Sequence, residues 1–256
     1  MEKGLKLGPG AFRDKTALRR SLKAFDWAYF GPEFCENLLE PGLLEGLRVL
    51  SGERKNVCLL TPMVTDKGLA ALEGLFSAVR KLRFKGRFEV SVNDFGVLDL
   101  IRRKRWDVRV NFGRQLARNF MLVGRDSVNI LNQSGLALLE ELKVGRLETA
   151  LFSRPPGPRL SGPAGALRFT AFYPYLDVTV TRTCLAGMPE VSPYDSPEGV
   201  RCARECLNAA YRVGSDRIKE DMIVGGNTIF VDSGGPVTAA MGKSLGVDRL
   251  VFCPDT

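Results

Sequence analysis

Short apolar runs alternate with amphipathic stretches along most of the 256-residue chain. The short runs predict strands, and the amphipathic stretches predict helices that cover a sheet. The expected strands lie at residues 26–31, 56–62, 87–94, 107–112, 127–132, 149–154, 168–174, 227–232 and 249–254. The expected helices lie at residues 67–82, 96–103, 134–144, 198–211 and 235–246.

This rhythm of strand–helix units predicts an α/β fold, namely a (β/α)8 barrel of the TIM-barrel type, complete or distorted. A doubly wound open sheet is the alternative. We expect one barrel domain over residues 1–256, with a basic N-terminal extension at 1–24 and a cysteine-bearing loop and helix at 184–213. In a barrel the segments after the strands form the functional face. Here they would be residues 31–35, 93–96, 111–116, 132–135, 153–157 and 232–235.

Histidine is absent from the sequence. Its absence excludes Ser-His-Asp and Cys-His catalytic arrangements, and it excludes metal sites with imidazole ligands. Acid–base chemistry must therefore come from Asp, Glu, Lys, Tyr, Cys or a cofactor. No apolar run approaches the length of a membrane-spanning helix, and the N-terminus lacks the apolar core of a secretory signal. We therefore expect a cytoplasmic protein without a membrane span.

The formal net charge of +8 is unevenly distributed, since residues 80–118 carry twelve Lys and Arg against four Asp and Glu. A basic region can attract RNA, an anionic metabolite or an acidic partner protein. The same charge is typical of solvated helix surfaces. Nucleic acid is therefore a conceivable partner that no recognised binding motif supports.

Three of the six cysteines, Cys184, Cys202 and Cys206, lie near one another in the sequence. Ser196 and Pro197 can begin a helix on which residues 202 and 206 would share one face. Two thiols so placed can bind one metal centre, and the loop after Cys184 can bring in the third. The alternative is that all three are small core residues. Disulfides are disfavoured in the reducing cytosol.

A tetrahedral sulfur site needs a fourth ligand. Cys58 and Cys253 each lie inside an apolar strand pattern, which favours buried core thiols. Cys35 differs because it follows the strand and turn "WAYFGPEF", on the rim where binding loops gather.

Several segments resemble peptidase family U thirty-two, the collagenase-like proteins. "YDSPEGVRCAREC" resembles the cysteine-ending loop of that family, and "FEVSVNDFGVLDLIRRK", "NFGRQLARN" and "ALFSR" resemble its strand-end segments. "WAYFGPEFC" resembles the Tyr-x-Gly-x-x-x-Cys stretch of the UbiV-like members, in the ubiquinone-biosynthesis branch of UbiU and UbiV. Other branches take a ligand from the position that is Asp177 here. The resemblance implies Cys35, Cys184, Cys202 and Cys206 as ligands of a four-iron four-sulfur (4Fe-4S) cluster, with Zn as the alternative metal for four thiolates.

The resemblance also implies oxygen-independent hydroxylation of an aromatic ring or a nucleobase, with a paralogous family member as heterodimer partner. It further implies that prephenate, an anionic small molecule, serves as the oxygen donor. A basic rim with Arg114, Gln115, Asn132 and Arg154 could bind such a dicarboxylate, and the alternative is that each is a structural residue at a strand end. Two alternatives are a hydrolase of the peptidase type and a non-catalytic protein with a structural four-cysteine metal site.

Overall fold

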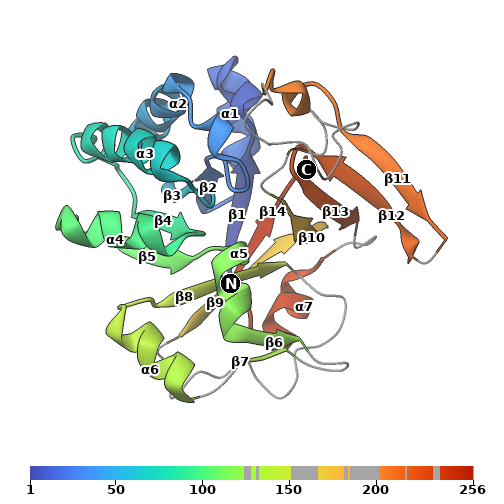
Figure 1. Ribbon diagram of the computed structural model, residues 1–256. Helices are drawn as coiled ribbons and strands as arrows, with labels where there is room; N and C mark the ends of the chain where they lie inside the picture. Colours follow the sequence, from blue (N-terminus) through green and yellow to red (C-terminus); the bar gives the residue numbers. More distant parts are fainter. Residues whose placement is uncertain are drawn as a thin grey trace.

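The computed structural model describes residues 1–123, 128–130, 133–150, 167–181, 184, 202–216, 218–232 and 237–255. Eight parallel strands form a closed barrel in the order β1-β14-β9-β8-β5-β4-β3-β2 (Figure 1). These strands are β1 (Glu2–Leu7), β2 (Trp27–Phe30), β3 (Asn56–Leu60), β4 (Phe88–Val92), β5 (Arg109–Phe112), β8 (Arg146–Ala150), β9 (Arg168–Tyr173) and β14 (Arg249–Phe252). The predicted TIM-barrel-like fold is confirmed, and the open-sheet alternative is wrong.

Helices lie outside the barrel strands (Figure 1). The α-helices are α1 (Lys15–Leu22), α2 (Pro41–Gly52), α3 (Asp66–Val79), α4 (Phe95–Arg103), α5 (Arg114–Ala117), α6 (Gln133–Glu141) and α7 (Ala239–Ser244). Short 3-10 turns occur at η1 (Pro9–Phe12), η2 (Glu36–Leu38), η3 (Arg118–Phe120) and η6 (Glu205–Leu207). Local sequence explains the helix starts: the Asp14 side chain accepts hydrogen bonds from two backbone N–H groups of α1, and proline begins α2.

Alternation along the strands divides the apolar residues between two layers. On β2, Ala28 and Phe30 belong to the large core between strands and helices, whereas Trp27 and Tyr29 belong to a separate cluster that includes Phe172. Because successive strand residues point to opposite faces, the second cluster fills the barrel interior.

A second, antiparallel sheet has the strand order β10-β13-β12-β11 and follows β9 in the chain (Figure 1). Its strands are β10 (Tyr175–Val180), β11 (Tyr211–Ser215), β12 (Ile218–Gly225) and β13 (Thr228–Asp232). A third, two-stranded sheet pairs β6 (Met121–Val123) with β7 (Val128–Ile130). Because β10 starts directly beyond the carboxyl end of β9, the second sheet lies at the end of the barrel where functional loops gather.

Three expectations from the sequence need correction. Residues 2–7, expected in an N-terminal extension, form barrel strand β1, which pairs with both β2 and β14. The strands expected at 127–132 and 227–232 correspond to β7 and β13, which belong to the antiparallel sheets and not to the barrel. The sequence pattern of a strand is the same in a barrel and in an antiparallel sheet, because it reports which residues are buried and not which strand lies beside it.

The barrel interior also holds buried charge. The Arg249 side chain is fully buried, lies 3.5 Å from the centre of the Trp27 ring, and donates hydrogen bonds to Tyr29 Oη at 2.7 Å and to Glu89 Oε2 at 2.9 Å. Arg249 also pairs with Glu2 at 2.8 Å. The guanidinium therefore links β14 to three other barrel strands, β1, β2 and β4.

Glu148 on β8 is fully buried and accepts a hydrogen bond from Ser91 Oγ at 2.5 Å, while its Oε1 atom has no hydrogen-bond partner in the described part of the chain. Burial raises the pKa of this carboxyl to about 7. The proton is therefore retained in the folded state at pH values where an exposed glutamate would already have lost it.

None of the described helices has the length and apolar character needed to cross a membrane.

The raised pKa of Glu148 predicts a pH dependence of stability. The carboxyl ionises near its ordinary value of 4.5 in the unfolded chain but near 7 in the folded protein. Folding stability should therefore fall as the pH rises through this window, by roughly 3 kcal/mol in total. In the Glu148→Gln variant, stability should no longer fall between these pH values. The free energy of unfolding, measured with urea at about pH 5 and about pH 8, tests this. Glu45→Gln, which changes an exposed carboxylate, is the control, and an unchanged pH slope in Glu148→Gln would contradict the prediction.

Candidate functional site

Cys35 lies on the loop that leaves β2 at the carboxyl end of the barrel. Gly31 begins this loop with a φ of +139°, and a Cβ atom there would lie 2.2 Å from the backbone oxygen of Leu60. Glycine is therefore required for the chain to turn out of the barrel beside β3. Cys35 precedes η2, and its backbone oxygen accepts a hydrogen bond from Leu38 N–H at 3.3 Å.

Glu33 holds this loop against the barrel rim. It is buried and forms a two-point ion pair with Arg114, with Nε to Oε1 at 2.6 Å and Nη2 to Oε2 at 2.7 Å. Lys6 Nζ donates to Oε2 at 3.0 Å. Burial by itself would raise the pKa of Glu33, but Arg114 and Lys6 outweigh it and lower the pKa to about 2. The carboxylate is therefore ionised at neutral pH.

Arg114 also joins the loop to the second sheet. Its Nη1 atom donates to Asp177 Oδ1 on β10 at 3.1 Å and to the backbone oxygen of Tyr175 at 3.3 Å. Asp177 pairs with Arg118 as well. One buried guanidinium thus binds carboxylates from two segments, and the ion pairs fix how the Cys35 loop sits relative to β10.

Gln115, the residue after Arg114, supports the same loop. Its Nε2 atom donates to the backbone oxygen of Glu33 at 2.7 Å, and its backbone N–H donates to Asn93 Oδ1 at 2.9 Å. Asn93 in turn donates to the backbone oxygen of Thr61 at 2.8 Å. The rim segments after β2, β3, β4 and β5 are therefore linked by hydrogen bonds.

Cys202 and Cys206 lie on the segment that precedes β11. The helix expected at 198–211 is wrong over its described part, because only Glu205–Leu207 is helical, as a 3-10 turn, and β11 begins at Tyr211. Arg204 has a φ of +64°, which interrupts any helix between the two cysteines. The two thiols therefore do not share a helix face, and pairing of β11 with β12 takes the place of the expected last helical turns.

Arg204 links this segment to the loop of Cys35. Its Nη1 atom lies 2.5 Å from Oε1 of Glu40, the residue at the N-cap position of α2 shortly after η2. Both side chains are partly exposed, so the ion pair stabilises the contact only modestly. Cys184 follows the end of β10 and is partly buried.

The four thiols of Cys35, Cys184, Cys202 and Cys206 lie close enough to influence one another electrostatically. Burial is the main cause that raises the pKa of Cys35, and Cys202 and Cys184 raise it further, whereas the backbone N–H of Asn37 lowers it. Burial likewise raises the pKa of Cys206 to about 11, with added contributions from Cys184, Cys35 and Cys202. The thiols of Cys35, Cys184 and Cys202 therefore lie near enough to Cys206 to raise its pKa.

A metal ion would remove the mutual repulsion of four thiolates. Within the described residues, no group of three or more His, Cys, Asp or Glu side chains is already placed to hold a metal ion. Cys35, Cys58, Cys202, Cys206 and Cys253 are free thiols. The donor chemistry fits a thiolate-bound metal centre, but binding would require the side chains to close around the metal and release protons.

Cys58 and Cys253 are buried with Trp27 and Tyr29 in the barrel interior, which agrees with their interpretation as core thiols. Burial raises the pKa of both thiols above the ordinary value of a cysteine. Both therefore stay protonated and apolar in character.

The residues predicted to bind an anionic substrate have different surroundings. Arg114 is 1% exposed, and its guanidinium is already paired with Glu33 and Asp177, so a dicarboxylate would have to compete with both. Gln115 is partly buried beside it. Asn132 and Arg154 lie outside the described residues. The role of these four residues stays a prediction.

Sequence reasoning did not single out Glu33 or Lys6, although both contribute to the rim. A glutamate two residues before a candidate ligand, in a segment rich in aromatic residues, is a weak signal for a buried ion pair. Its partner Arg114 was predicted to lie on the rim, but pairing between them depends on barrel closure and leaves no trace in sequence spacing.

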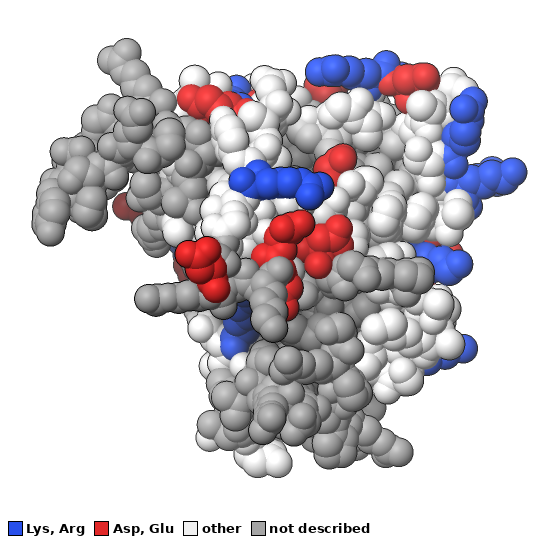
Figure 2. Space-filling view, turned by 90° about the vertical axis from the view of Figure 1, so that its right-hand side faces the viewer, with Lys and Arg blue, Asp and Glu red and all other residues white. Residues whose placement is uncertain are grey.

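Figure 2 shows the face of the molecule on the side of β11 and β12. Among the described residues, Asp and Glu side chains lie near the middle of this face, and most Lys and Arg side chains lie toward its margins. The basic helix α4 lies on the opposite side of the barrel in Figure 1. The described part of this face therefore presents no continuous basic surface for nucleic acid.

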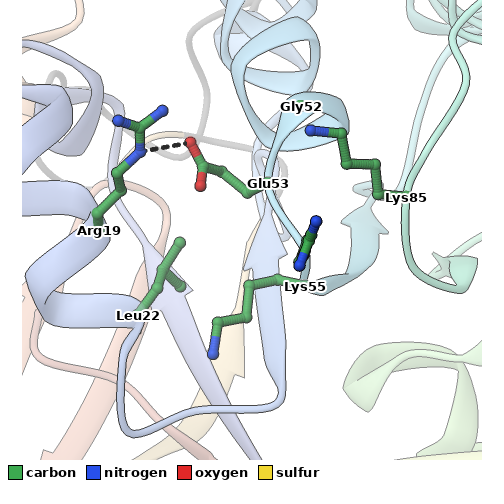
Figure 3. A pocket seen from close by; sticks show the side chains of 7 residues that line it. Arg19, Leu22, Gly52, Glu53, Lys55 and Lys85 are labelled. Carbon is green, nitrogen blue, oxygen red and sulfur yellow. Dashed lines mark hydrogen bonds and ion pairs between the residues drawn. The ribbon is translucent and has the colours of Figure 1, made fainter.

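A basic hollow of about 450 Å³ lies at the other end of the barrel, where the strands begin (Figure 3). Arg19 pairs with Glu53 at 2.9 Å, and Lys55 Nζ donates to the backbone oxygen of Phe25 at 2.6 Å, just beyond the end of α1. The Lys85 side chain runs toward Gly52, where α2 ends (Figure 3). Cations at helix carboxyl ends complement the helix dipole, which gives these residues a structural role.

Comparisons of the chain with protein-family models, with curated proteins and with solved structures find no match. The fold by itself defines the class of protein, a closed barrel of eight parallel strands with helices outside it.

The ion pairs of Arg114 predict a large stability effect. Arg114→Met keeps most of the side-chain volume but leaves Glu33 and Asp177 without their shared partner, so it should lower the free energy of unfolding by roughly 3–5 kcal/mol. Arg118→Met removes a side chain that is 41% exposed and leaves Asp177 paired with Arg114, so it should cost much less. Urea unfolding at neutral pH measures both variants. An equal decrease in the free energy of unfolding of the two variants would show that the buried ion pairs of Arg114 contribute no more to stability than the partly exposed pair of Arg118.

Proposed function

We propose that the protein is an iron–sulfur protein in which Cys35, Cys184, Cys202 and Cys206 hold a 4Fe-4S cluster, and that it takes part in oxygen-independent hydroxylation. The observation that carries the proposal is that the turn between β12 and β13 joins the segments of these thiols: Asn227 Nδ2 donates to the backbone oxygens of Phe34 and Thr181, and Cys206 packs against Gly226. Cys35 lies far from the other three in the sequence, so its proximity to them is a product of the fold and not of chain connectivity.

The other candidate ligands have competing roles. Cys58 and Cys253 are buried in the barrel interior, away from solvent. Asp177 occupies the position from which other branches of the resembled family take a ligand, and its carboxylate is engaged by Arg114 and Arg118. These observations support Cys35 as the fourth ligand, which is the UbiV-like pattern.

When bound, a cluster of this kind supplies one-electron redox chemistry. The chain would contribute four thiolates to hold it, and the Glu33–Arg114 pair would keep the Cys35 loop in place. Cations near the thiolates would offset their charge, and Arg204 lies between two of the ligands in the sequence.

Hydroxylation of an aromatic ring or a nucleobase is the reaction class that the resemblance supports, with a paralogous partner protein. Gln115 is the residue that we propose to contact an anionic substrate such as prephenate. Its Oε1 atom is buried and has no hydrogen-bond partner in the described part of the chain, so it can accept a hydrogen bond from a substrate hydroxyl group.

Metal analysis after anaerobic purification tests the proposal. The wild-type protein should be brown and contain about four irons and four sulfides per chain. Cys184→Ala and Cys206→Ala should each lose most of the iron, because three thiolates hold a cluster poorly. Cys253→Ala should keep the iron, since this thiol lies in the barrel interior.

Three results would contradict the assignment. Full iron content in Cys184→Ala or Cys206→Ala would exclude these ligands. One zinc per chain in place of iron would instead indicate a structural site of four cysteines. Metal-free wild-type protein, whose stability is unchanged by Cys202→Ser, would leave the four thiols without a metal-binding role.

A further inference from the structure

The turn between β12 and β13 contacts each of the segments that carry Cys35, Cys184 and Cys206. It consists of Gly226 and Asn227, because Gly225 pairs with Thr228 across the hairpin. Gly226 has a φ of +64°, and two-residue hairpin turns favour glycine where φ is positive. The local sequence thus explains why the chain reverses here.

Asn227 is buried, at 7% exposure, and its side-chain amide bridges two of these segments. Its Nδ2 atom donates to the backbone oxygen of Phe34 at 2.9 Å and to the backbone oxygen of Thr181 at 2.7 Å. Phe34 immediately precedes Cys35, and Thr181 lies three residues before Cys184. One amide group therefore holds together the backbone next to one thiol and the backbone leading to another.

The backbone of Asn227 strengthens the second connection. Its carbonyl oxygen accepts hydrogen bonds from Thr181 N–H at 2.9 Å and from Thr181 Oγ1 at 3.2 Å. The Oδ1 atom of Asn227 accepts a bond from Thr228 Oγ1 at 3.2 Å, which fixes the orientation of the amide. Both Nδ2 hydrogens are thereby directed at the two carbonyl groups.

Gly226 contacts the third segment, which carries Cys206. A Cβ atom at this position would lie 3.3 Å from Cβ and 3.5 Å from Sγ of Cys206. The absence of a side chain at residue 226 lets Cys206 pack directly on the turn. The same two residues thus approach Cys206 and bridge the backbone of the Cys35 and Cys184 segments.

We propose that Asn227 is the positioning residue of the cysteine site, setting the separation of Cys35 from Cys184 and Cys206 before any metal binds. The role as a metal-site residue rests on the function proposed above, whereas the positioning itself does not. A carboxylate has the same shape as the amide but no N–H donors. At residue 227 it would face the backbone oxygens of Phe34 and Thr181 without a hydrogen bond to either. Asn227→Asp should therefore release the Cys35 loop from the second sheet.

Cross-linking in the metal-free protein measures the positioning directly. In a Cys184→Ser, Cys202→Ser background, Cys35 and Cys206 are the thiols left at the rim, while Cys58 and Cys253 are buried. A short bis-maleimide should cross-link Cys35 to Cys206, identified by peptide mass spectrometry, and Asn227→Asp should lower the yield severalfold. Asn56→Ala is the matched control, because it removes an amide that accepts from Arg87 N–H at the far end of the barrel.

Zinc affinity of the otherwise native chain, measured by competition with a chelator, gives the second readout. Asn227→Asp should weaken binding roughly 10-fold to 100-fold, as losing a partner that orients metal ligands commonly does. Asn56→Ala should leave both the cross-linking yield and the zinc affinity unchanged. The melting temperature of each variant shows whether its fold persists, and Gly226→Ala provides a second perturbation of the same turn.

The outcomes separate the two proposals. Unchanged cross-linking in folded Asn227→Asp overturns the positioning role, whatever the metal content of the wild type. Reduced cross-linking in Asn227→Asp, together with a wild type that binds neither iron nor zinc, supports the positioning role and overturns the metal site. Equal losses in Asn227→Asp and Asn56→Ala would show a general loss of stability and overturn the positioning role.

Discussion

The arrangement of the functional end depends on the buried ion pairs of Arg114. This side chain from the segment after β5 binds Glu33 on the loop after β2 and Asp177 on β10 of the second sheet. In a buried setting the attraction between such charges does not guarantee net stability, because removing them from water is costly. What the pairs do enforce is geometry: a shift of either partner would leave a charge without its counterpart, so the loop and the sheet can dock in one way.

This geometry has a consequence for the thiols. Cys35 lies two residues beyond Glu33, and Cys184 lies seven residues beyond Asp177, so the ion pairs fix the starting points of two ligand-bearing segments. The hydrogen bonds of Asn227 then hold the same segments nearer to the thiols themselves. Cys202, by contrast, is exposed and lies on a segment whose described link to the Cys35 loop is a partly exposed ion pair. The site therefore combines a buried, hydrogen-bonded part around Cys35 with a more exposed part around Cys202.

The barrel could be predicted from sequence because its strands are short apolar runs separated by amphipathic helices, a pattern that depends on local burial alone. The second sheet could not, since β10 directly follows β9, and on β11 the apolar residues Tyr211 and Val213 are exposed, so their pattern does not report burial. The expectation that Cys202 and Cys206 share a helix face was wrong, because a positive φ at Arg204 and a short 3-10 turn take the place of the helix. Cys206 instead packs against Gly226 in the turn between β12 and β13, a contact that only the folded chain reveals. Asn227 had a signal of its own, a Gly-Asn pair before a strand, but that pattern predicts a turn and says nothing about what the amide contacts.

Because the chain has no histidine, protons at the candidate site would be held by thiols. Each ligand candidate is a thiol, and burial together with the neighbouring thiols raises the pKa of Cys35 and Cys206. Without metal, the thiols of Cys35 and Cys206 therefore stay protonated at neutral pH. Metal binding must expel those protons, and it then replaces repulsion among the ligands with attraction to a shared cation. Because the ligands come from the barrel loop, the end of β10 and the segment before β11, this exchange would couple metal binding to the docking of the second sheet on the barrel. The metal centre would then complete the attachment that the ion pairs of Arg114 begin.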